Sequence, residues 1–186
     1  MSGERRAVLR RMTESAMLVT LDWDDLAEAA HIGLDRQLNA VRKGYKDRVV
    51  AGREVFDPYR THVEGAIAEC AVSKVLQVPW SKSIDTFKGP DCGENIQVRY
   101  SRTSDLIVRQ RDNLQHIYVL VTGGERVGYD VWSYEIEGWI YGIEVERLGS
   151  WRNPHGHSPA WFVNRSRLHD IRDLINNLKN AVDNKK

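Results

Sequence analysis

The sequence lacks the features that stabilise or anchor a chain without a packed core. Only two of its 186 residues are cysteines, Cys70 and Cys92, too few for a disulfide framework or a four-cysteine zinc site. No apolar run approaches the roughly 20 residues that a membrane helix needs. The basic start MSGERRAVLRRM is not followed by the apolar stretch and cleavage site of a secretory signal. We therefore expect a reduced, cytoplasmic protein with no membrane partner.

A strong net charge is absent as well. The formal net charge is +1, so the field of the whole molecule will not drive binding to nucleic acid. A local basic patch remains at residues 99–111. This stretch contains four arginines, Arg99, Arg102, Arg109 and Arg111, and a single acid, Asp105. The stretch is either a DNA-binding patch or a solvated face of mixed charge, and composition alone leaves both open.

Internal repeats and low-complexity segments are also absent, and the length suits one domain. The apolar fraction of 41% is near that of ordinary globular proteins, so a core can form. Residues 1–16 are polar and rich in arginine, which indicates a basic N-terminal arm. We expect residues 17–186 to form a single domain.

Apolar side chains recur at helical spacing in three segments. The helices that this spacing predicts cover residues 23–47, 61–77 and 166–182. Asp22 is the expected N-cap of the first helix, and Gly44 its expected end. Thr61 and Glu64 fit a capping box at the start of the second helix.

Between the second and third helices the sequence is typical of strands. Residues 95–101 alternate, with Ile96, Val98 and Tyr100 on one face and Gln97 and Arg99 on the other. The other expected features are strands at 106–109 and 116–122, a turn at Gly123-Gly124, one long strand or a bent pair at 130–145 with bulges at Gly138 and Gly142, a loop at 149–160, and an edge strand at 160–163. This order predicts an α/β (α+β) fold with a mixed central sheet flanked by helices.

Glu69 is the first candidate functional residue. At helical spacing its neighbours three and four positions away include no basic residue, and its helix is expected to be buried on most sides. A buried carboxylate is costly unless a cation meets it. That partner is an arginine, a lysine or a metal from elsewhere in the fold, and a structural ion pair with an arginine of the sheet is the alternative to a functional site.

Asp91 precedes the 95–101 strand in a turn, and Gln97 and Arg99 follow on one face of that strand. A hard divalent cation prefers oxygen ligands. The Asp91 carboxylate, the Gln97 amide oxygen and the Val98 main-chain carbonyl offer three such ligands at one end of a sheet. The alternative is a turn aspartate beside two polar residues on a solvated face.

The order of these residues resembles the PD-(D/E)XK nuclease signature. The matching parts are Glu69 in a helix, Pro90-Asp91 at a turn, and the strand triplet Gln97-Val98-Arg99. Stretches such as VEGAIAECAVSKVL, IQVRY and YVLVT are similar to those of small phage and prophage proteins with this core, over about residues 20–170. The resemblance implies a restriction-endonuclease-like core and a metal-dependent DNA endonuclease. If the chain is phage-encoded, it implies the host cytoplasm as the location.

The resemblance also implies roles for these residues. Asp91 and Gln97 would hold Mg²⁺ or Mn²⁺ with the Val98 carbonyl, and Glu69 would bind the ion directly or through water. Arg99 would clamp a phosphate. The residues that would contact DNA are Arg99, Arg102, Arg109, Arg111 and Lys88.

Two departures from the signature qualify these expectations. Arg99 stands where the family usually has lysine, and an arginine stays protonated and cannot act as a base. Gln97 replaces an acid, which lowers the negative charge of the site and weakens its hold on a metal. A catalytically weak or inactive module that binds DNA or a host protein is therefore the alternative, and a homodimer is left open.

Overall fold

The computed structural model describes residues 16–45, 57–84, 89–102, 105–126, 132–153 and 159–183. The expected basic arm, except for its last residue, and Lys88 lie outside these described residues. The described elements, in chain order, are β1 (Met17–Leu21), α1 (Trp23–Arg42), α2 (Pro58–Leu76), β2 (Ile96–Tyr100), β3 (Asp105–Arg109), β4 (Ile117–Arg126), β5 (Trp132–Tyr141), η1 (Gly142–Glu144), α3 (Val145–Leu148), β6 (Ser150–Arg152), β7 (Ala160–Asn164), η2 (Arg165–Arg167) and α4 (Ile171–Asp183).

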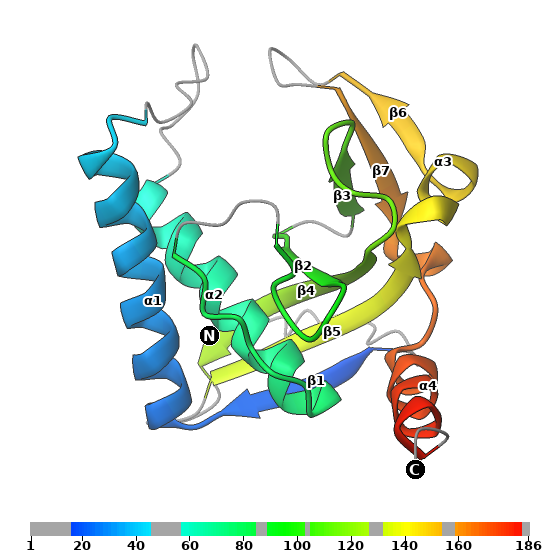
Figure 1. Ribbon diagram of the computed structural model, residues 1–186, viewed down its shortest axis with the longest axis horizontal. Coiled ribbons are helices and arrows are strands. Elements are labelled where there is room, and N and C mark those ends of the chain that lie inside the picture. The colour runs from blue at the N-terminus through cyan, green and yellow to red at the C-terminus, as the bar shows by residue number, and fades with distance from the viewer. Residues whose placement is uncertain are drawn as a thin grey trace, which may run out of the picture.

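The strands form two sheets. The larger sheet has the order β1-β5-β4-β2, in which β2 runs parallel to β4 and the other neighbours are antiparallel. The smaller sheet has the order β3-β7-β6 and is antiparallel throughout. Figure 1 shows α2 lying across the larger sheet, with α1 outside it. The expected α/β (α+β) class with a mixed sheet is confirmed.

The first helix begins where the sequence predicts and ends earlier. The Asp22 side chain caps α1 by accepting a hydrogen bond from the Asp25 N–H, at 3.0 Å. The helix stops at Arg42 rather than at residue 47, because Gly44 takes a left-handed φ of 67° and the Tyr45 N–H donates back to the Ala40 carbonyl.

The second helix begins three residues before the predicted start. Pro58 opens α2 and the Asp57 side chain caps it, accepting from the Tyr59 N–H at 3.0 Å. The Thr61 hydroxyl donates to the Asp57 carbonyl, so the capping box predicted at Thr61 is wrong. Proline at the first helical position loses nothing, since its missing N–H would be unpaired there.

One face of the larger sheet carries the main core against α2. Ile96 and Val98 from β2 are buried there, and Tyr100 packs against the same cluster, so the predicted alternation of this strand is confirmed. On the far side of α2, a Cβ added to Gly33 of α1 would lie 2.5 Å from the Val63 Cα of α2. The two helices therefore approach each other at backbone distance through a glycine.

The other face of the larger sheet is covered by the smaller sheet rather than by helices. A second buried cluster joins the two sheets through Tyr118, Leu120, Ile140, Leu106, Val108 and Val163. The strand expected at the edge, β7, is therefore the middle strand of its sheet. Its partner β6 lies in the segment expected to be a loop, and all three of its residues are exposed, so no apolar pattern marks it.

Several local predictions in the second half are also wrong. Gly123 and Gly124 lie within β4, at φ values of 93° and 97°, and form an irregularity in its pairing with β5 rather than a turn. Gly142 begins a short 3-10 helix instead of forming a bulge. The bulge predicted at Gly138 is confirmed, because the pairing shifts between Leu120–Gly138 and Val121–Ile136.

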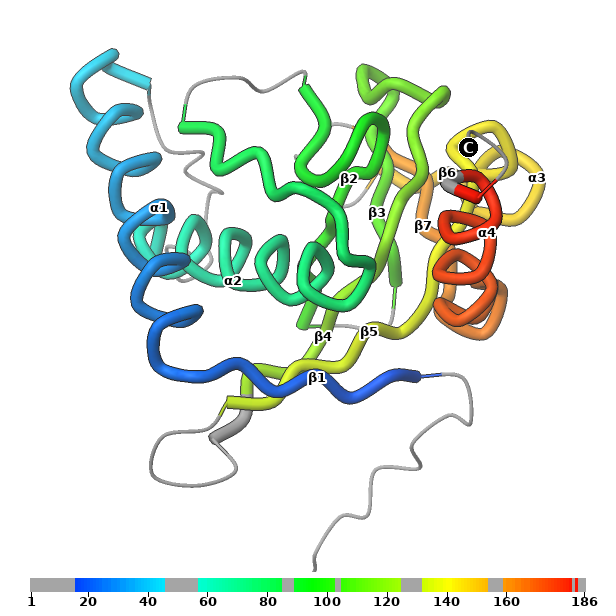
Figure 2. The backbone as a smooth tube through the Cα atoms, turned by 60° about the horizontal axis from the view of Figure 1, so that its bottom comes forward, coloured from blue at the N-terminus to red at the C-terminus, as the bar shows by residue number. Residues whose placement is uncertain are grey.

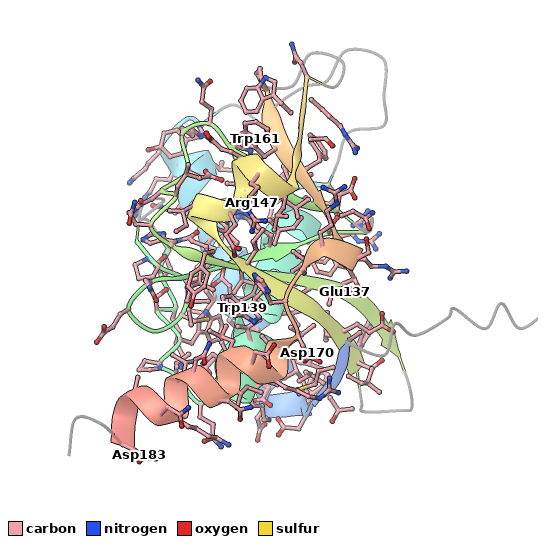
Figure 3. All side chains as sticks on the ribbon, turned by 90° about the vertical axis from the view of Figure 1, so that its right-hand side faces the viewer. Glu137, Trp139, Arg147, Trp161, Asp170 and Asp183 are labelled. Atoms are coloured by element: carbon pink, nitrogen blue, oxygen red, sulfur yellow. The ribbon has the colours of Figure 1, made fainter. Side chains whose placement is uncertain are left out.

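The last helix begins at Ile171 rather than at residue 166, after a short 3-10 turn. Figure 3 shows Trp139 of β5 directed toward Asp170, just before the helix, and the Trp139 indole donates to the Asp170 carbonyl at 2.9 Å. This contact fixes the start of α4 against the sheet. In the described part of the chain, no helix combines the length and the apolar character needed to span a membrane.

Candidate functional site

A tight turn places Asp91 at the start of β2. The Asp91 N–H donates to the Ile96 carbonyl at 2.8 Å, and Cys92 bridges to Ile96, so the chain folds back on the strand it is about to enter. The Asp91 carboxylate then accepts from the Val98 N–H, at 2.8 Å. The turn aspartate therefore lies beside the middle of the strand that carries Gln97, Val98 and Arg99, as the sequence predicts.

Asp91 also lies near Glu69, which α2 presents to the same place. The pKa of Asp91 is raised to about 6, first by burial and then by the charge of Glu69. The Val98 N–H, Arg99 and Arg36 act in the opposite direction. Two carboxylates from a helix and a turn thus lie in one buried environment, so the structure brings these two predicted residues together.

Arg99 folds back onto this group of oxygens. Its Nη1 atom lies 3.1 Å from the Val98 carbonyl oxygen, 3.2 Å from Gln97 Oε1 and 4.0 Å from Asp91 Oδ2. Its Nη2 atom donates to Asp112 at 3.0 Å. One positively charged nitrogen therefore contacts or approaches the three oxygens that the sequence assigns to a divalent cation.

Asp112 anchors this conformation of Arg99. The same oxygen that accepts from Arg99 also accepts from the Arg109 N–H at the end of β3, at 3.0 Å. Asp112 thus caps the turn after β3 and holds the guanidinium at the same time. Its position after the apolar strand residues 106–108 indicates a loop cap, but no local pattern indicates that it binds Arg99.

Glu69 is paired with an arginine of α1. Both Glu69 oxygens accept from the Arg36 guanidinium at 2.7 Å, and the Trp80 indole donates to one of them at 2.9 Å. The Arg36 Nε also donates to the Ser83 carbonyl. The predicted structural ion pair is present, but its arginine comes from α1 and not from the sheet. No local pattern in the sequence identifies Arg36 as this partner, because the contact depends on how α1 crosses α2.

Two further polar groups complete the site. The Gln97 Nε2 donates to the Gly89 carbonyl at 2.6 Å, which leaves the amide oxygen facing Arg99. The Cys92 thiol donates to the Glu69 carbonyl at 3.4 Å, and burial raises its pKa. A raised thiol pKa disfavours the nucleophilic thiolate, so Cys92 acts as a packing residue.

The other predicted DNA-contacting arginines lie apart from this group. Arg102 is bound by Glu64 of α2, with distances of 2.8 and 3.0 Å. Arg109 and Arg111 are exposed at the end of β3 and in the turn after it. Of the described arginines predicted to contact DNA, only Arg99 belongs to the site itself.

The donor set fits a hard divalent cation by its chemistry. The donors are the Asp91 carboxylate, the Gln97 amide oxygen and the Val98 main-chain carbonyl, all oxygens of the kind that Mg²⁺ and Mn²⁺ prefer. Both oxygens of Glu69, the other predicted ligand, accept from Arg36 instead. Across the described residues, no group of three or more histidine, cysteine, aspartate or glutamate side chains is arranged to hold a metal. A cation here therefore depends on Gln97 and Val98, whose oxygens are bonded to Arg99.

Comparison with protein-family models, with curated proteins and with solved structures finds no match to this chain.

Proposed function

We propose that this chain is a metal-dependent DNA endonuclease with a restriction-endonuclease-like core. The observation that carries the proposal is the convergence of Glu69 and Asp91, from a helix and from a turn, at the strand that presents Gln97 and Arg99. Support for the core comes from α2 packing on a mixed sheet in which β2 runs parallel to β4. DNA as the substrate rests on the resemblance described above.

Each side chain has a distinct role in this proposal. Asp91, Gln97 and the Val98 carbonyl would hold Mg²⁺ or Mn²⁺, which activates water and stabilises charge on a phosphate when bound. Glu69 and Arg36 position the helix side of the site. Arg99 binds a phosphate oxygen of the substrate and stabilises the charge that develops there, because its guanidinium remains positive throughout.

Arg99 has to leave the oxygens of Gln97 and Val98 before they can bind a cation. Its contact with Asp112 lies outside the metal donors, so the guanidinium can pivot about that carboxylate while remaining paired. When the Arg99 guanidinium moves toward the bound phosphate, it exchanges its hydrogen bonds to Gln97 and Val98 for charge-assisted hydrogen bonds to the phosphate oxygens. The proposed reaction thus couples substrate binding to release of the metal donors.

The test is cleavage of plasmid DNA with Mg²⁺ or Mn²⁺. We expect the native protein to nick the plasmid, and both a chelator and Asp91→Ala to abolish nicking. Asp173→Ala is the matched control, since Asp173 is an exposed acid of α4, and this variant should cleave like the native protein. Cleavage that survives Asp91→Ala, or no cleavage with either metal, would overturn the proposal.

A second function is favoured by the position of the Arg99 guanidinium. An internal cation on the metal donors suits a module that binds the DNA backbone without cutting it. In that case DNA affinity without metal should fall steeply with salt and should weaken in Arg99→Ala. Plasmid cleavage would then be absent in every variant.

Metal affinity separates the two functions. For the nuclease, Arg99→Ala removes a charge that competes for the same oxygens, so we expect Mn²⁺ to bind about tenfold tighter, equivalent to about 1.4 kcal/mol. Isothermal titration calorimetry without DNA measures this, with Arg102→Ala as the control because Arg102 pairs with Glu64 instead. If neither the native protein nor Arg99→Ala bound Mn²⁺, the result would favour the DNA-binding module without cleavage.

A further inference from the structure

The helix α1 carries a second apolar face in addition to the one that packs on α2. Its buried residues, which include Leu26, Ala29, Gly33 and Gln37, form the first face. The second face, here called the α1 stripe, consists of Trp23, Ala27, Ala30, Leu34, Leu38 and Val41 at helical spacing, with Tyr45 just beyond the helix. Its large side chains are exposed, Leu38 by 49% and Val41 by 58%.

The α1 stripe lies at the outer edge of the molecule. Figures 1 and 2 both show α1 standing outside α2, with no described element on its far side. Scattered exposed apolar residues are normal on a protein surface, but a contiguous row of them indicates an interaction site. The order of the residues in the row indicates what binds there.

The α1 stripe is symmetric about Leu34. Leu38 and Ala30 stand four positions to either side, and Val41 and Ala27 stand seven positions to either side. Tyr45 and Trp23 likewise stand eleven positions away. If a second copy of α1 packed antiparallel with Leu34 on the two-fold axis, Leu38 and Val41 would therefore each meet an alanine, and Leu34 would meet its own copy. A row that is complementary to itself in this way is the property that an isologous interface requires.

The charges beside the α1 stripe agree with the same arrangement. The first turn of α1 is acidic, with Asp24 and Asp25, and its last turn is basic, with Arg42. Asp24 and Arg42 lie on the same flank, since the interval between them is five turns at 3.6 residues per turn. Antiparallel packing about Leu34 brings Arg42 of one copy within two positions of Asp24 of the other, and it also opposes the two helix dipoles.

We infer that the α1 stripe is a homodimer interface in which two copies of α1 pack antiparallel about Leu34. The occupant is a second copy of this chain, because both the size pattern and the charge pattern are complementary to themselves. The interface is independent of the Asp91 site, and the inference holds whether or not the chain cleaves DNA.

Sedimentation velocity over a wide concentration range tests the interface. We expect a dimer for the native protein, and Leu38→Glu should raise its dissociation constant about 100-fold, because the two-fold axis repeats the change on both sides. Leu18→Glu is the matched control, since Leu18 of β1 is exposed by 51% away from the α1 stripe, and it should dimerise like the native protein. A native monomer at all concentrations, as expected if residues 46–56 cover the stripe, would overturn the inference.

Cross-linking tests the register. The native Cys70 and Cys92 are buried, so an introduced thiol reports on its own position. Leu34→Cys should give a disulfide-linked dimer on mild oxidation, and a mixture of Ala27→Cys with Val41→Cys should link one copy of each. Val41→Cys alone should remain unlinked. Efficient linking of Val41→Cys to itself, without linking of Leu34→Cys, would contradict the antiparallel register.

Discussion

Replacing Glu69 with alanine is expected to lower the free energy of unfolding by about 3–5 kcal/mol, because it leaves the buried charge of Arg36 without its partner. The Arg36 side chain is only 14% exposed, and Glu69 accepts two of its hydrogen bonds. The Trp80 indole loses its acceptor in the same variant. Thermal unfolding followed by circular dichroism should show a fall in Tm of about 10 °C for a chain of this length.

Two further variants give this prediction its controls. Glu64→Ala, on the same helix, removes an acid whose partners Arg60 and Arg102 are largely exposed, so its cost should be about 1 kcal/mol or less. Replacing Arg36 with methionine together with Glu69→Leu should recover most of the lost stability, since no buried charge then remains. A loss for Glu69→Ala no larger than that for Glu64→Ala would show that the pair is not effectively buried.

The need for a cation at Glu69 could be predicted from the sequence, but its source could not. A carboxylate on a mostly buried helix requires a partner wherever the fold places it. Which residue supplies that partner depends on how two helices cross, and here a glycine at position 33 lets α1 approach α2 closely enough for Arg36 to reach Glu69. No spacing within either helix encodes that crossing.

The strand side of the site was easier to predict because its geometry is local. Alternation fixes the faces of β2, and a short turn fixes Asp91 beside Val98. The position of Arg99 was not predictable in the same way. The flexible Arg99 side chain can reach several acceptor oxygens of similar energy. Asp112, whose hydrogen bond fixes the guanidinium in its observed place, lies thirteen residues later in the chain.

The strands that were missed share a physical cause. β1 and β6 are short. β1 (MLVTL) is almost entirely apolar in sequence although its burial alternates, and all three residues of β6 are exposed. Neither sequence therefore shows the alternation of apolar and polar residues that predicts a strand. Their pairing is decided by longer neighbours, β5 and β7. Gly123 and Gly124 read as a turn because glycine pairs usually mark one, whereas the long hairpin partner β5 extends the pairing through them.

Asp91→Asn is expected to stabilise the protein at neutral pH and, if the proposed nuclease function holds, to abolish cleavage. The pKa of Asp91 is about 6 in the folded chain, above its ordinary value of 3.8. From about pH 4 to pH 6 the folded state therefore binds more protons at this group than the unfolded state, and stability falls as the pH rises through that window. Above pH 6 the buried Asp91 carboxylate is ionised in the folded protein, which lowers the free energy of unfolding by an amount on the order of 2–3 kcal/mol.

Asparagine removes that titration and retains an oxygen that can accept the Val98 N–H. Urea unfolding should therefore show the variant more stable than the native protein at pH 8 by about 2 kcal/mol, with the difference vanishing near pH 4. Added Mn²⁺ should narrow the gap at pH 8, because an ion that binds only the native folded site stabilises it by mass action. A variant that is equally or less stable at pH 8 would mean that Asp91 is already neutralised by Arg99 and Arg36, and the site would then have no free charge for a metal. A gain in stability that accompanies loss of activity is the trade expected of a residue kept for function.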